Sequence, residues 1–334
     1  MRKKIKDTDY LAISARIKAM ENGLLTRERM EQVLEARTDE EALKLLQESG
    51  YPELHATDPE SLDAALSASR EETLADLADS VPDPRYIDIF KLKYDYHNVK
   101  AILKAGAMGV SPDHMLMDMG RVSTAELKKA LQSGELENLP PMVASAAAEA
   151  REVLETTRDP QLSDIVLDRW CYKDMDAVAE TTGSAFLHGY VKAQIDAANL
   201  RSLVRTIRMG KNETFLAGIL FAGGDVAEDA ILKVSAAKGS GMKELYQYTR
   251  FHAAAEAGAE ALGGGPLTEF EKLCDDAVGD YLAGAQMVPF GEAPLVGYLA
   301  ARETEYTNLR ILLIGRSTGL PADVIRSRLR ASYV

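Results

Sequence analysis

The chain has 334 residues, and 46% of them are hydrophobic, which is enough apolar surface for one or several packed cores and excludes a disordered tail. The net charge of −13 and the pI near 5.0 argue against binding to nucleic acid or directly to an anionic lipid surface. Cys171 and Cys274 show neither metal-ligand spacing nor a disulfide pattern, which fits a reducing compartment.

The start of the chain and the length of its apolar runs bear on secretion and membrane insertion. Residues 1–7 are basic, but no apolar segment follows them, so we expect no signal peptide. There is no stretch of about 18 apolar residues, so we also expect no direct membrane span. These features predict a cytoplasmic protein that is peripheral to a membrane only through a protein partner.

Taken in order, the chain predicts one helix after another. Apolar residues follow helical spacing from Tyr10 onward, and Thr26 and Thr38 stand where the N-caps of the next two helices are expected. Between positions 53 and 88, ten acids accompany two arginines on an amphipathic helical pattern, which fits either a solvated surface or a docking face for a basic partner. Pro82-Asp-Pro84 then interrupts the helix.

Evidence for strands is thin along the whole chain. Sustained alternation of apolar and polar residues is scarce, and no hairpin turn lies between β-branched runs. The predicted fold class is therefore all-α.

One short motif occurs three times, each time as an acid followed three residues later by asparagine, then a branched aliphatic residue, then lysine or arginine. The acid–asparagine pairs are Asp95 with Asn98, Asp196 with Asn199, and Glu305 with Asn308. The asparagines are 101 and 109 residues apart, so each copy fills about a third of the chain. Repetition at such a period indicates an internally duplicated architecture.

Each motif acid should point into a packed interior. Apolar residues follow each acid at positions +4, +7 and +8, which is the stripe of a core-facing helix. A buried carboxylate needs a partner, such as the asparagine or a donor on a neighbouring helix. The basic residue at +5 points elsewhere and is not expected to be that partner. We interpret the pairs as structural contacts that fix helix register, while a shared metal or proton site remains the alternative.

The similarity extends beyond the motif. A proline lies 39 residues before the first and second asparagines, and a helix start follows each of the three at a nearly constant offset. These matches predict three helical repeats, covering residues 1–118, 119–226 and 227–334.

A search for chemistry finds no catalytic, cofactor-binding or metal-binding residues. No phosphate-binding glycine loop and no dinucleotide fingerprint is present. The histidines are scattered without metal-ligand or catalytic spacing, at positions 55, 97, 114, 188 and 252. One surface feature does stand out, because Arg201, Arg205 and Arg208 form a basic stripe that fits either a solvated helix edge or contact with an acidic partner.

Several long motifs in a fixed order resemble the C subunit of archaeal and bacterial V/A-type ATPases, the counterpart of the eukaryotic V-ATPase d subunit. The resemblance covers essentially the whole chain. The residues that carry it are Tyr10 with Arg16 and Met20, the segment from Phe90 to Asn98, Phe290-Gly-Glu292, Glu305-x-x-Asn308-Leu-Arg310, and Tyr333-Val334.

The resemblance implies a funnel of three similar helical subdomains in the central stalk. Such a rotor component couples the shaft subunits of D and F type to the membrane proteolipid ring of c, K or L type, for ATP-linked H⁺ or Na⁺ transport. It binds no cofactor and is not itself an enzyme. The competing hypothesis is an all-helical ligand-binding or metal-binding protein, or an enzyme, that uses the inward acid–asparagine pairs.

Overall fold

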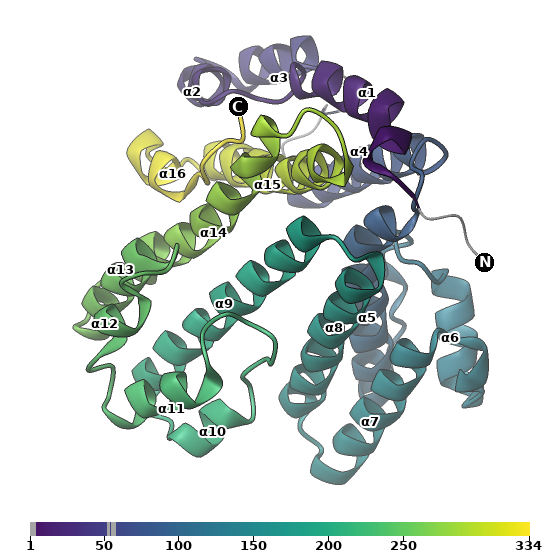
Figure 1. Ribbon diagram of the computed structural model, residues 1–334, viewed down its shortest axis with the longest axis vertical. Helices are drawn as coiled ribbons and strands as arrows, with labels where there is room; N and C mark the ends of the chain where they lie inside the picture. Colours follow the sequence, from purple (N-terminus) through teal and green to yellow (C-terminus); the bar gives the residue numbers. More distant parts are fainter. Residues whose placement is uncertain (1–4, 52–53, 55–57) are drawn as a thin grey trace.

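The computed structural model describes residues 5–51, 54 and 58–334, and throughout these residues the regular structure is helical, without a strand (Figure 1). The predicted all-α class is confirmed. Glu53 and His55 lie outside the described residues. The helices are α1 Leu11–Glu21, α2 Arg27–Glu35, α3 Asp39–Glu48, α4 Pro59–Ala78, α5 Arg85–Met108, α6 Thr124–Ser133, α7 Pro141–Thr157, α8 Pro160–Thr182, α9 Ala185–Arg208, α10 Glu213–Ala217, α11 Glu228–Ala236, α12 Met242–Tyr246, α13 His252–Leu262, α14 Leu267–Ala283, α15 Glu292–Ser317 and α16 Ala322–Arg328.

Local capping explains where several helices begin. The side chains of Thr26 and Thr38 accept hydrogen bonds from the first turns of α2 and α3, as predicted from the sequence. Asp58 and Ser184 cap α4 and α9 in the same way. Each cap satisfies a backbone N–H that the helix itself leaves unpaired.

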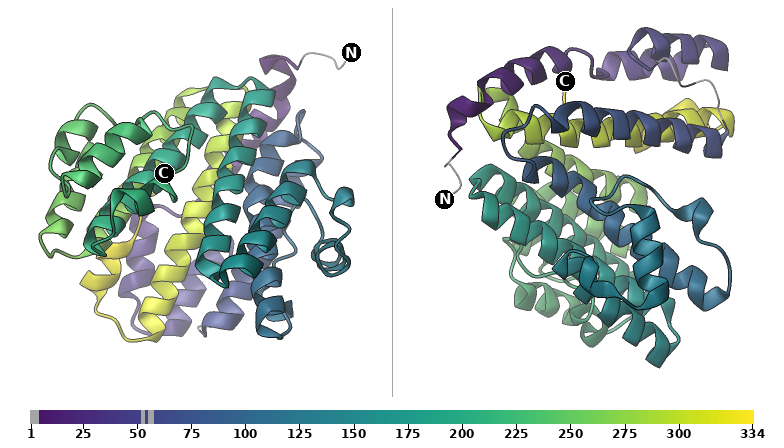
Figure 2. Two further views of the ribbon diagram at one scale, coloured as in Figure 1. Left: turned by 90° about the horizontal axis from the view of Figure 1, so that it is seen from below. Right: turned by 90° about the vertical axis from the view of Figure 1, so that its right-hand side faces the viewer.

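Three long-helix hairpins share one junction, namely α4 with α5, α8 with α9, and α14 with α15 (Figures 1 and 2). The starts of α5, α9 and α15 come together there. Ser184 at the start of α9 donates to Glu292 at the start of α15, at 2.6 Å. Arg85 at the start of α5 donates to the Thr181 carbonyl near the end of α8, at 2.5 Å.

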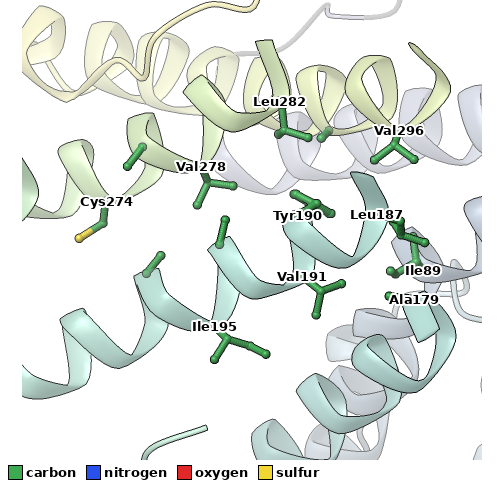
Figure 3. Close-up of a cluster of buried hydrophobic side chains, with 14 of the residues drawn as sticks. Ile89, Ala179, Leu187, Tyr190, Val191, Ile195, Cys274, Val278, Leu282 and Val296 are labelled. Carbon is green, nitrogen blue, oxygen red and sulfur yellow. The ribbon is translucent and has the colours of Figure 1, made fainter. Parts of the chain in front are cut away.

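Buried side chains bind the arms of neighbouring hairpins together. One cluster joins α5 with α6, α7 and α8. The central cluster joins α9 to α14, with Tyr190 on one side and Cys274 and Val278 on the other (Figure 3). Burial of these side chains supplies the main driving force for this packing.

The third cluster brings the two ends of the chain together. Val33 of α2 and Leu46 of α3 are fully buried with Leu309 and Leu312 of α15. Helices α2 to α4 therefore pack onto α15, although they are far from it in sequence (Figure 2). The predicted divisions at 118 and 226 mark repeated sequence and stay a prediction, whereas the buried clusters mark which helices pack together.

None of the described helices is both long enough and apolar enough to cross a bilayer.

Candidate functional site

The three motif asparagines make the same contact. Each is at most 1% exposed, and its amide pairs with both the N–H and the C=O of one residue in the segment that follows its long helix. The pairs are Asn98 with Met117 at 2.9 and 2.7 Å, Asn199 with Phe221 at 2.8 and 2.8 Å, and Asn308 with Arg330 at 2.8 and 3.1 Å. A side-chain amide can do this because it carries a donor and an acceptor side by side.

The acids of the first two motifs hold the next part of the same segment. Asp95 accepts hydrogen bonds from the backbone N–H groups of Arg121 and Val122, at 2.8 and 3.1 Å. Asp196 accepts from the N–H groups of Asp225 and Val226, both at 3.1 Å. In both cases the bound pair lies just before a helix, α6 or α11.

The third acid makes the equivalent contact with the other end of the chain. Glu305 accepts from the backbone N–H of Leu25, which lies just before the cap of α2, and from the hydroxyl of Tyr51. The hydrogen bond from the N–H of Leu25 to Glu305 thus corresponds to the one from the N–H of Val122 to Asp95. The N-terminal part of the chain thus completes the third motif site.

These contacts correct one expectation from the sequence. The acid and asparagine of a motif are not hydrogen-bonded to each other among the described residues, and the acid's main partners are loop backbone N–H groups rather than donors on a neighbouring helix. The basic residue at +5 is not the acid's partner, as predicted. Lys100 pairs with Asp168, and Arg310 pairs with Asp63.

The charge around the three acids differs. Arg121 lies 2.7 Å from Asp95 and 2.6 Å from Asp174, and Arg302 lies 2.6 Å from Glu305. Asp196 has no ion-pair partner among the described residues, since nearby Lys192 pairs with Asp225 instead. Two sites therefore contain a compensating guanidinium, and the middle site does not.

The pKa values follow burial and this difference in charge. Burial raises the pKa of Asp95 and of Glu305, and the facing Arg121 and Arg302 oppose that rise. Burial raises the pKa of Asp196 to about 6, opposed mainly by the backbone N–H groups of Val226 and Asp225. Asp196 is thus the motif acid whose carboxylate is least compensated.

Two glycines make room for the aspartates. A Cβ atom on Gly120 would lie 2.2 Å from Oδ1 of Asp95, and one on Gly224 would lie 2.2 Å from Oδ1 of Asp196. Such distances are far inside van der Waals contact, so a side chain at either position would displace the carboxylate. Sequence reasoning missed both glycines, although the pattern of glycine, one residue, then valine recurs at 120–122 and 224–226.

The three acids are not assembled into one reactive centre. No hydrogen-bond or ion-pair partner is shared by any two of them within the described part of the chain. Their oxygens accept from backbone N–H groups, arginine or a tyrosine hydroxyl, which is the chemistry of a structural anchor. No contact in the described residues supports the competing hypothesis that these acids form a ligand-binding or enzymatic site.

The basic stripe lies along α9 and faces α14. Arg201 pairs with Glu271 and Asp275, Arg205 also pairs with Glu271, and Arg208 donates to a backbone carbonyl. These guanidinium groups help to join the two helices. Contact of Arg201, Arg205 and Arg208 with a partner protein stays a prediction.

The architecture and the repeated sites define an all-helical protein whose distinctive buried polar contacts join long helices to connecting segments. Comparison with known proteins identifies its family. The model of the ATP synthase (C/AC39) subunit family matches residues 13–328, so the chain belongs to this family. The resemblance to the C subunit of V/A-type ATPases is thereby confirmed.

Curated relatives align over nearly the whole chain. The C subunit of the V-type sodium ATPase of Enterococcus hirae is 26% identical, with 97% of this chain and 99% of the relative covered. The C subunit of the A-type ATP synthase of Methanocaldococcus jannaschii is 24% identical, over 96% and 86% of the two chains. That of Haloquadratum walsbyi is 25% identical, over 94% and 96%.

Replacing Asn199 by leucine should lower the free energy of unfolding by about 1–3 kcal/mol, because the N–H and C=O of Phe221 lose their buried partner. Chemical denaturation measures this loss. Asn138→Leu is the matched control, since Asn138 is exposed and should change stability little. An Asn199→Leu variant as stable as the parent would contradict the anchoring interpretation.

Gly120→Ala should destabilise the chain by about 1–3 kcal/mol, because the new methyl group collides with the Asp95 carboxylate. Gly106→Ala serves as the control, since a Cβ there meets nothing within 4 Å and alanine favours a helix. Thermal unfolding of both variants decides the matter. If Gly120→Ala melted at the same temperature as the parent, the segment around Gly120 would be able to shift away from Asp95 without loss of stability.

Asp196 should make stability depend on pH in a particular direction. Its folded pKa of about 6 lies above the ordinary value of 3.8, so the folded state binds the proton more tightly than the unfolded state. Its contribution to stability should therefore fall as pH rises from about 4 to about 6. The stability of the parent minus that of Asp196→Asn, measured by denaturation at each pH, should decrease across this window. If this difference in stability stayed constant across the window, the raised pKa of Asp196 would be contradicted.

Proposed function

We propose that the chain is a non-catalytic central-stalk subunit of a V/A-type ATPase or ATP synthase. It couples the shaft subunits of D and F type to the membrane proteolipid ring during ATP-linked H⁺ or Na⁺ transport. The observation that carries the proposal is the family match over residues 13–328, together with relatives of similar length that are named as C subunits. Because the match covers nearly the full length, it supports a function of the whole fold rather than of a single motif.

The architecture supports a mechanical task. A coupling part must transmit torque without yielding, and close-packed helices deform little. In this chain the three hairpins share one junction, and each long second helix holds a connecting segment through a buried asparagine. We propose that the hairpins and their attached helices form three related units, arranged with approximate threefold symmetry as a funnel.

Catalysis belongs to other subunits in this proposal. The sequence has no nucleotide-binding loop, and the motif acids are used as anchors for the backbone. The protein would act in the cytoplasm and would associate with the membrane through the ring. It would bind neither nucleic acid nor a cofactor.

Binding to both neighbours tests the proposal. The tagged full-length chain is mixed with purified D and F type shaft subunits, and separately with the detergent-solubilised ring from the same genome. We expect retention of both at micromolar concentration, and incorporation of the chain into the assembled complex. A tagged helical protein of similar size and net charge controls for non-specific binding. The proposal fails if the chain binds neither neighbour and does not enter the complex.

A further inference from the structure

The residues held by the motif asparagines face the first helix of the hairpin in two of the three cases. The ring of Phe221 lies 4.5 Å from the ring of Tyr172 on α8, measured between centroids. Arg330 lies 2.7 Å from Asp275 on α14. The chain itself therefore bridges the space between the two helices of the second and third hairpins.

The first hairpin is different at this point. Helices α4 and α5 diverge from their shared turn (Figure 2, right), and Met117, the residue held by Asn98, lines an open groove of about 960 Å³ between them. Ala64 and Ala68 of α4 form part of one wall, and Met115 and Met117 line the other. No hydrogen bond, ion pair or ring contact links the Met117 side chain to α4 in the described structure, so this space lacks the bridge found in the other two hairpins.

The wall on α4 is acidic and incompletely neutralised. Glu60 and Glu71 are exposed in the groove and have no hydrogen-bond or ion-pair partner among the described residues. Among the other charged residues of the groove, Lys100 and Lys104 bind aspartates of α8 and Asp63 binds an arginine of α15. Asp118 accepts a hydrogen bond from the backbone N–H of Thr124 and adds a further negative charge. The unpaired carboxylates of Glu60 and Glu71 therefore make the electrostatic potential in the groove negative, which favours a positively charged occupant.

The shape and chemistry of the groove fit a helix. Ala64 and Ala68 are one helical turn apart, so the backbone of a second helix can approach α4 closely there. Methionine side chains adapt to varied apolar surfaces, which makes the Met115 and Met117 wall a suitable contact for leucine, methionine or aromatic residues. A helix with one apolar and one basic face would satisfy both walls.

We propose that the α4–α5 groove binds a basic amphipathic helix from another subunit of the ATPase complex, an inference that rests on the proposed function. Its apolar face packs against Met115 and Met117, and its lysines or arginines face Glu60 and Glu71. The bound helix supplies the bridge that Phe221 and Arg330 supply in the other two hairpins.

Photo-crosslinking in the assembled complex tests this inference. A benzophenone amino acid is placed at Ala68, which is exposed and lines the groove, and in a second variant at Ala75, which is exposed on α4 outside the groove. The complex is purified through the tagged chain, irradiated, and analysed by mass spectrometry. We expect Ala68, but not Ala75, to crosslink to one other protein of the complex, at a segment rich in lysine or arginine with helical apolar spacing.

Charge reversal supplies a second measurement. Glu60→Lys combined with Glu71→Lys should reduce the Ala68 crosslink by about tenfold or more, because attraction to a cationic helix becomes repulsion. Glu72→Lys combined with Asp79→Lys changes the charge equally on exposed residues of the same region that do not line the groove. This control should leave the crosslink within about twofold of the parent.

The outcomes separate the two proposals. If the chain purifies with the complex and Ala68 gives no crosslink, or gives one to a second copy of the chain or to a segment without basic residues, the groove inference is wrong and the proposed function stands. An unchanged crosslink after charge reversal also overturns the inference. If the chain never enters the complex, the proposed function fails, and the groove inference fails with it.

Discussion

The buried asparagine amide that pairs with both backbone groups of one distant residue is the contact on which the structure depends. A buried N–H or C=O without a partner costs free energy, so the segment after each long helix cannot leave its asparagine without loss. This contact places the segment. In the first two copies the motif acid then accepts hydrogen bonds from the next N–H groups, just before α6 or α11, whereas Glu305 accepts from the N–H of Leu25, just before α2. The position of the following helix is thereby tied to the long helix.

The third site links the stability of the two chain ends. Leu25 and Glu305 are 280 residues apart, whereas Val122 and Asp95 are 27 apart. The first two sites can form as local units, but the third requires that nearly the whole chain be present. Long-range closure of this kind is slow to form during folding. Once formed, it joins the ends of the chain through packed helices, which is compatible with the proposed role in transmitting torque.

Local signals carried most of what could be predicted from the sequence. Helices, caps such as Thr26 and Thr38, and the inward direction of the motif acids depend on neighbouring residues, so periodicity and residue type were sufficient. The partners of the acids depend on backbone groups 26 to 280 residues away, which no local pattern specifies. Gly120 and Gly224 did give a signal that could have been recognised, because a glycine that recurs two residues before a valine indicates a close approach of the backbone to another group.

The three copies keep the same anchor but have diverged around it. Asp95 and Glu305 have guanidinium partners, whereas Asp196 has none among the described residues. The spaces beside the asparagine-bound residues are bridged by aromatic rings in one case and by an ion pair in another, and the space beside Met117 is open. The hydrogen bonds between each asparagine and the backbone do not depend on the surrounding side chains. The three copies therefore keep the same backbone contacts while their surrounding side chains differ. A protein that contacts different partners at different places benefits from this separation between shared backbone contacts and differing side chains.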